Sequence, residues 1–87
     1  MNTYTYSVIF NRDEEGVTIK FPMFDMEIYE ETDDEMLAAK EILTLEIVNC
    51  LDANKSLPNN EVGIVTENDE VVDITVTEED IALVVRE

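Results

Sequence analysis

Residues 32–53, TDDEMLAAKEILTLEIVNCLDA, are the one stretch of this sequence with the length and pattern of a long helix. Thr32 and Glu35 have the spacing of a capping box, in which a hydroxyl and a carboxylate bond reciprocally to free backbone N–H groups. Projected at about 100° per residue, one apolar stripe could lie on a sheet. Its members are Met36, Ala39, Leu43, Ile47, Cys50 and Leu51. We therefore expect the rest of the chain to cover this helix.

The same helix is more apolar than one buried stripe requires. Ala38, Ile42 and Leu45 fall on a second side, and Leu37 and Val48 on a third. A surface helix is normally polar opposite its buried stripe, and a short chain can cover little of it. We interpret Ile42 and Leu45 as a self-association surface. The alternatives are self-association through an exposed sheet edge, and a helix wholly covered by its own domain.

Three strands are expected before the helix. Apolar and polar residues alternate over residues 3–10, 17–21 and 24–29, which is the period of a strand with one buried face. The polar residues 11–16 form a turn in which Gly16 can take a positive φ. Pro22 cannot donate to a ladder and should mark a strand end or an edge. The pattern predicts a three-stranded antiparallel meander with the helix over its inner face.

The remaining residues predict one further strand and a weak helix. Residues 54–60 are a turn-rich connection, and residues 62–66 could form a short strand or an extended arm. Residues 71–76 alternate as a strand, which we expect to be parallel to the first because it follows a helical crossover. Thr77 and the acids after it could cap a short helix, although Val84 and Val85 favour a strand. The expected fold is a single α+β domain over residues 1–87, in the order βββαβ with a possible C-terminal helix.

Charge is the strongest compositional signal. The 87 residues include 22 acids, 5 bases and no histidine, for a net charge of −17. Nucleic acid phosphates and anionic membranes attract basic surfaces, so direct binding to either is not expected. A basic macromolecule is the expected partner, and the alternative is that the charge only maintains solubility.

Cysteine content and hydropathy bear on the compartment. Cys50 is the single cysteine, so no intrachain disulfide can form, which fits a reducing compartment such as the cytoplasm. A basic and apolar leader and a run of 18 apolar residues are both absent, so we expect neither secretion nor a membrane span.

The acids are concentrated where the third strand leads into the helix. Seven acids and no base lie between Asp25 and Glu35. Such carboxylates repel one another unless a cationic group is near. Asp13–Glu15 is a second candidate segment, and a solvated acidic rim is the alternative to a docking surface. Phe24 or Tyr29 could supply an apolar anchor. The candidate partner-binding residues are Asp25, Glu27, Tyr29, Glu30, Glu31, Asp33 and Asp34.

Six short segments follow one another along the chain: Tyr6–Phe10, Asp13–Gly16, Phe21-Pro22, Thr32–Glu35, Ala39–Glu41 and Leu57-Pro58. In their order and spacing, over about Tyr4 to Pro58, they resemble the HicB family of antitoxins. The family's usual proline, glycine and cysteine after the Phe-Pro pair are replaced by Asp25, Met26 and Glu27.

The resemblance implies a partly degraded ribonuclease H-like domain that binds and neutralises HicA, a small basic toxin that cleaves messenger RNA. It also implies a dimer or a higher oligomer. Many HicB proteins carry a C-terminal helix-turn-helix or ribbon-helix-helix domain that binds DNA. The residues after the helix leave no room for a helix-turn-helix, so we expect this chain to lack that domain.

Catalysis is not expected. A ribonuclease H centre needs several carboxylates on divalent metal, one of them in the first strand, and residues 3–10 contain no acid. Histidine for proton transfer, a second cysteine and a glycine-rich phosphate loop are also missing from the sequence. We therefore expect no enzyme activity, cofactor or metal site. The alternative functions are an acidic nucleic-acid mimic, such as a phage inhibitor of a DNA-binding protein, and a metal-dependent hydrolase, which the missing carboxylate disfavours.

Overall fold

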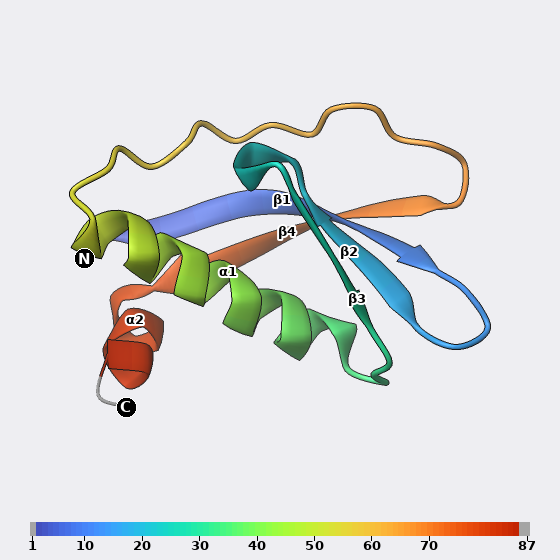
Figure 1. Cartoon of the computed structure of the whole chain (residues 1–87), viewed down its shortest axis with the longest axis horizontal. Helices are drawn as coiled ribbons and strands as arrows, with labels where there is room; N and C mark the ends of the chain where they lie inside the picture. Colours follow the sequence, from blue (N-terminus) through green and yellow to red (C-terminus); the bar gives the residue numbers. More distant parts are fainter. Residues whose placement is uncertain (1, 86–87) are drawn as a thin grey trace.

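Four antiparallel strands form one sheet, and the long helix lies across one face of it (Figure 1). The computed structural model describes residues 2–85, so Met1, Arg86 and Glu87 of the predicted domain lie outside it. The order across the sheet is β3-β2-β1-β4, which confirms the α+β class and makes the first three strands an antiparallel meander. The elements are β1 (Thr3–Arg12), β2 (Val17–Phe21), the 3-10 turn η1 (Pro22–Phe24), β3 (Met26–Glu30), α1 (Glu35–Asp52), β4 (Asp69–Thr77) and α2 (Glu78–Val85).

The core lies between the inner face of the sheet and one stripe of α1. Alternation along the strands directs their large apolar side chains toward the helix, where Ala39, Leu43 and Ile47 are fully buried. Met36 and Leu51, predicted in the same stripe, lie in the first and last turns of α1 and are exposed. The fully buried side chains of the inner face include Val8, Phe10, Val17, Ile19, Phe21 and Val76.

Strand β4 runs antiparallel to β1. The prediction that the last strand is parallel to the first, as in the ribonuclease H-like order, is therefore wrong. Thr3 pairs with Thr77, and Asn11 pairs with Asp69. The prediction assumed that the helix acts as a crossover, which would return the chain to the end of the sheet where the first strand begins. Instead residues 53–68 run back over the sheet on the face opposite α1, as the yellow to orange trace in Figure 1 shows. Sixteen extended residues can span about 50 Å, and the longest dimension of the molecule is 36 Å.

We call residues 53–68 the arm and the face opposite α1 the outer face. The arm contains neither strand nor helix, so the short strand considered for residues 62–66 is not formed. The Tyr6 hydroxyl donates to the Pro58 carbonyl over 2.7 Å, and the Ser7 backbone N–H donates to Asn60 Oδ1 over 2.8 Å. The second bond satisfies the Ser7 N–H of β1 at a position before Ile9, where the pairing of β1 with β2 begins.

The two helices begin differently. The capping box predicted at Thr32 and Glu35 is wrong: Asp34 caps α1 by accepting from the Leu37 backbone N–H at 3.2 Å. Thr77 and Asp80 do form a reciprocal cap at α2, which confirms the short C-terminal helix. Within residues 2–85, neither helix has the length and apolar character needed to cross a membrane.

Candidate functional site

The predicted acidic residues form a strip along β3 and its connection to α1, not one compact cluster. Asp25 stands before β3 with a positive φ of 50°, and Glu27 and Tyr29 are exposed on the outer face. Asp33 and Asp34 lie past the other end of the strand. Five residues of strand extend about 16 Å, so the two ends of the strip cannot contact the same small group.

Asp34 has a local structural role. Its carboxylate accepts the Leu37 N–H, and its own N–H donates to Thr32 Oγ1 at 3.1 Å. An N-cap carboxylate of this kind satisfies a backbone donor that the helix itself leaves free. This capping role explains an acid at position 34 without a contact to a partner protein.

The structure joins the two acidic segments that the sequence offered as alternatives. The Tyr29 hydroxyl donates to Asp13 Oδ1 over 3.1 Å, which places the β1–β2 turn beside the end of β3. The same oxygen accepts the backbone N–H groups of Gly16 at 2.7 Å and Glu15 at 2.9 Å, and these bonds lower the pKa of Asp13. Desolvation is the largest cause that raises the pKa of Tyr29. The hydrogen bond to Asp13 and the negative charges of Asp13 and the nearby acids raise this pKa further.

A shallow hollow of about 250 Å³ lies at this junction. Arg12 borders it and bonds to Glu35 and to Glu70, which lowers the pKa of Glu35. Within residues 2–85 the salt bridges are Arg12 with these two acids and Lys40 with Asp80. None includes a predicted partner-binding residue. The hollow is lined by Arg12, Asp13, Glu14, Glu15, Gly16, Val17, Thr32, Asp33 and Glu35.

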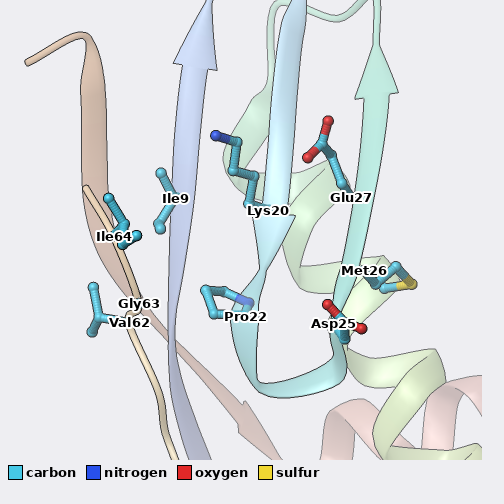
Figure 2. Close-up of a pocket in the computed structure, with 9 residues that line it drawn as sticks. All are labelled: Ile9, Lys20, Pro22, Asp25, Met26, Glu27, Val62, Gly63 and Ile64. Atoms are coloured by element: carbon cyan, nitrogen blue, oxygen red, sulfur yellow. The ribbon is translucent and has the colours of Figure 1, made fainter. Parts of the chain in front are cut away.

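The other end of the strip carries a cation. Lys20 of β2 is the cross-strand neighbour of Glu27 of β3, and Figure 2 shows both beside a second hollow of about 330 Å³. Ile9 and the arm residues 62–64 form the far side of this hollow. Because Lys20 offsets part of the negative charge, this end is less acidic than the junction with the β1–β2 turn.

The two predicted self-association residues have different environments. Leu45 is 50% exposed and lines a groove between α1 and α2. Ile42 is partly buried and packs against the core. Leu37, which the helical projection set on a third side of α1, lines the same groove as Leu45.

Within residues 2–85, no three His, Cys, Asp or Glu side chains are grouped so that they could hold a metal ion. The contact between Tyr29 and Asp13 was missed by sequence reasoning, because nothing local to either residue specifies which strand end meets which turn.

Comparison with protein-family models, with curated proteins and with solved structures finds no match to this chain. The resemblance to HicB antitoxins therefore stays a prediction.

Proposed function

We propose that this protein is an antitoxin of the HicB kind, which binds and neutralises a small basic ribonuclease in the cytoplasm. Binding uses the junction between the β1–β2 turn and the end of β3, which we call the acidic surface. The observation that carries the proposal is that these carboxylates have no salt-bridge partner within residues 2–85. The acidic surface comprises Asp13, Glu14, Glu15, Tyr29, Glu30, Glu31 and Asp33.

An unbalanced acidic surface suits a cationic partner. Opposite fields steer two proteins together and speed their association. Tyr29 is 44% exposed and adds an aromatic anchor of the type that is enriched at binding hot spots. The bond between Tyr29 and Asp13 fixes the two segments before the partner arrives, which reduces the entropy lost on binding.

The test uses a small basic ribonuclease encoded beside the gene for this chain. Increasing amounts of this protein should stop its cleavage of RNA at a stoichiometric ratio. The triple variant Glu30→Lys, Glu31→Lys, Asp33→Lys should bind about tenfold more weakly or worse at low ionic strength, because it reverses charge within the acidic surface. Inhibition of RNA cleavage and direct binding are both measured.

A matched control separates the surface from the net charge. Asp52→Lys, Glu61→Lys and Glu67→Lys make the same change in net charge at three exposed positions outside the acidic surface. This control should retain most of the affinity. Equal loss in both triple variants would show that only the net charge matters, and unaltered RNA cleavage at excess wild-type protein would end the proposal.

A further inference from the structure

A groove of about 510 Å³ separates α1 from α2. The leucine side chains that line it are unusually exposed to solvent: Leu37 is 53% exposed, Leu45 is 50% exposed and Leu83 is 64% exposed. Val84 lies beside them, and the polar lining residues are Lys40, Glu41, Thr44 and Asp80. None of these residues belongs to the acidic surface.

The two helices that form the groove differ in length. The 18 residues of α1 extend about 27 Å, whereas the 8 residues of α2 extend about 12 Å. The short helix is nevertheless fixed in place: Thr77 and Asp80 cap it, Asp80 Oδ2 lies 3.2 Å from Lys40 Nζ, and Ile81 packs against the core. The groove is thus a preformed feature between two anchored helices.

We propose that this groove binds one amphipathic α-helix of a partner protein, whose apolar face covers the leucines and whose flanks carry lysine or arginine. The proposal concerns a different surface from the acidic surface, and it does not depend on the partner being a ribonuclease.

Both walls of the groove favour a helix as the occupant. The backbone groups of α1 and α2 are bonded within each helix, so the walls offer only side chains. An extended peptide would enter with unpaired N–H and C=O groups and find few partners for them. A helix brings its backbone already satisfied and can place apolar side chains at i, i+3, i+4 and i+7 along the groove.

The length of the groove fits this spacing. Leu37, Glu41 and Leu45 follow one another at intervals of four residues along α1. They therefore span about 12 Å, or two helical turns. Two turns of a partner helix would cover the exposed leucines of both walls.

Charge favours a basic occupant over a second copy of this chain. Among residues 2–85, Lys40 is the one cation that lines the groove, and its salt bridge is with Asp80. Glu41 is exposed and has no salt bridge within these residues. A second copy would bring another net charge of −17 against the first. Like charges in contact oppose association, whereas a lysine or arginine beside Glu41 would be attracted.

The probe is a synthetic peptide of roughly 15 residues, with leucine at i, i+3, i+4 and i+7, lysine on both flanks and alanine elsewhere. A second peptide of identical composition has its leucines distributed around the helix. Binding is followed at physiological salt by the shifts of backbone amide resonances and by a titration that gives Kd. The amphipathic peptide should shift the amides of Leu37, Leu45 and Leu83, and should bind at least about tenfold more tightly than its rearranged isomer.

Two substitutions at exposed positions test the site itself. Leu45→Gln and Leu83→Gln should each weaken binding about fivefold to tenfold, because each removes apolar contact without changing charge. Ile64→Gln is the matched control, since Ile64 is 90% exposed on the arm, outside the groove. It should leave Kd unchanged. Amide spectra of all three variants establish that they fold.

Three outcomes would overturn the proposal. The two peptides could bind equally, which would indicate attraction to the net charge alone. The groove variants could lose no more affinity than Ile64→Gln. The amides of the groove could also shift with protein concentration in the absence of peptide and with formation of a dimer, which would assign the groove to a second copy.

Discussion

Gly16 is required by a close approach and not by its backbone angle. A Cβ atom at this position would lie 2.4 Å from the Glu30 carbonyl oxygen and 2.9 Å from the Tyr29 hydroxyl. The sequence suggested a positive φ for Gly16, and this is wrong: the glycine with a positive φ is Gly63, at 72°. Composition and turn rules indicate where a turn requires glycine. They do not show which distant part of the backbone lies close to it. The absent side chain is what lets the β1–β2 turn meet β3.

Replacing Gly16 with alanine should lower the free energy of unfolding by about 2 kcal/mol, because the new methyl group displaces backbone and not a flexible side chain. Gly63→Ala is the comparison. Its Cβ would meet no atom within 4 Å, so only the left-handed backbone is penalised, at about 1 kcal/mol. Urea denaturation of both variants measures the difference. A Gly16→Ala protein as stable as the wild type would show that the turn and β3 do not approach this closely.

Helix starts show which elements can be predicted from local sequence. Thr77 and Asp80 cap α2 as the spacing suggested, since both partners lie within four residues. At α1 the same logic fails, because Glu35 bonds to Arg12, which lies 23 residues earlier on β1. The meander was also predictable from local sequence, because alternation within each strand and short turns between strands specify it. The orientation of β4 was not, because the path of the arm depends on contacts such as Tyr6 with Pro58 and not on any signal within the arm.

The antiparallel pairing of β1 with β4 predicts an engineered disulfide between residues 5 and 75. Thr5 and Thr75 are direct cross-strand partners, and their hydroxyl oxygens lie 2.8 Å apart. In a Cys50→Ser background, Thr5→Cys with Thr75→Cys should oxidise readily, because direct partners have Cα separations in the range of natural disulfides. The bond should raise the free energy of unfolding by up to about 4 kcal/mol.

Mass spectrometry and thermal unfolding with and without reductant check this bond. Thr5→Cys with Val71→Cys is the control, since Val71 lies four residues along the same strand, opposite Ile9, and should stay reduced. The register described here would be contradicted if the variant with cysteines at 5 and 71 formed a disulfide and the variant with cysteines at 5 and 75 stayed reduced.

At the scale of the whole molecule, the net charge of −17 acts against the compact state. The salt bridges of Arg12 and Lys40 are partly solvent-exposed, and surface pairs contribute only about 0–1 kcal/mol each. Repulsion among the remaining carboxylates should therefore exceed the attraction of these pairs. The charge was evident from composition alone, but its concentration at one junction emerges only when the β1–β2 turn and β3 are brought together.

Added sodium chloride should therefore raise the melting temperature by about 5 °C, which corresponds to roughly 1 kcal/mol in a chain of this size. Most of the rise should occur below about 0.3 M, because over this range screening shortens the reach of the charges from about 30 Å at 0.01 M to less than about 10 Å. Thermal unfolding followed by circular dichroism at several salt concentrations measures it. A melting temperature that falls with salt would show that attractive pairs dominate the electrostatics of the fold.

The pairing of Thr3 with Thr77 also governs when this protein can complete its fold during synthesis. The first strand leaves the ribosome well before β4, the neighbour that covers one of its edges, because β4 follows the long helix and the arm. Contacts between such distant residues form slowly, because a large loop must close before they are made. While translation is under way, the β1 edge that later pairs with β4 is open to other chains, which is the stage at which unpaired strands aggregate.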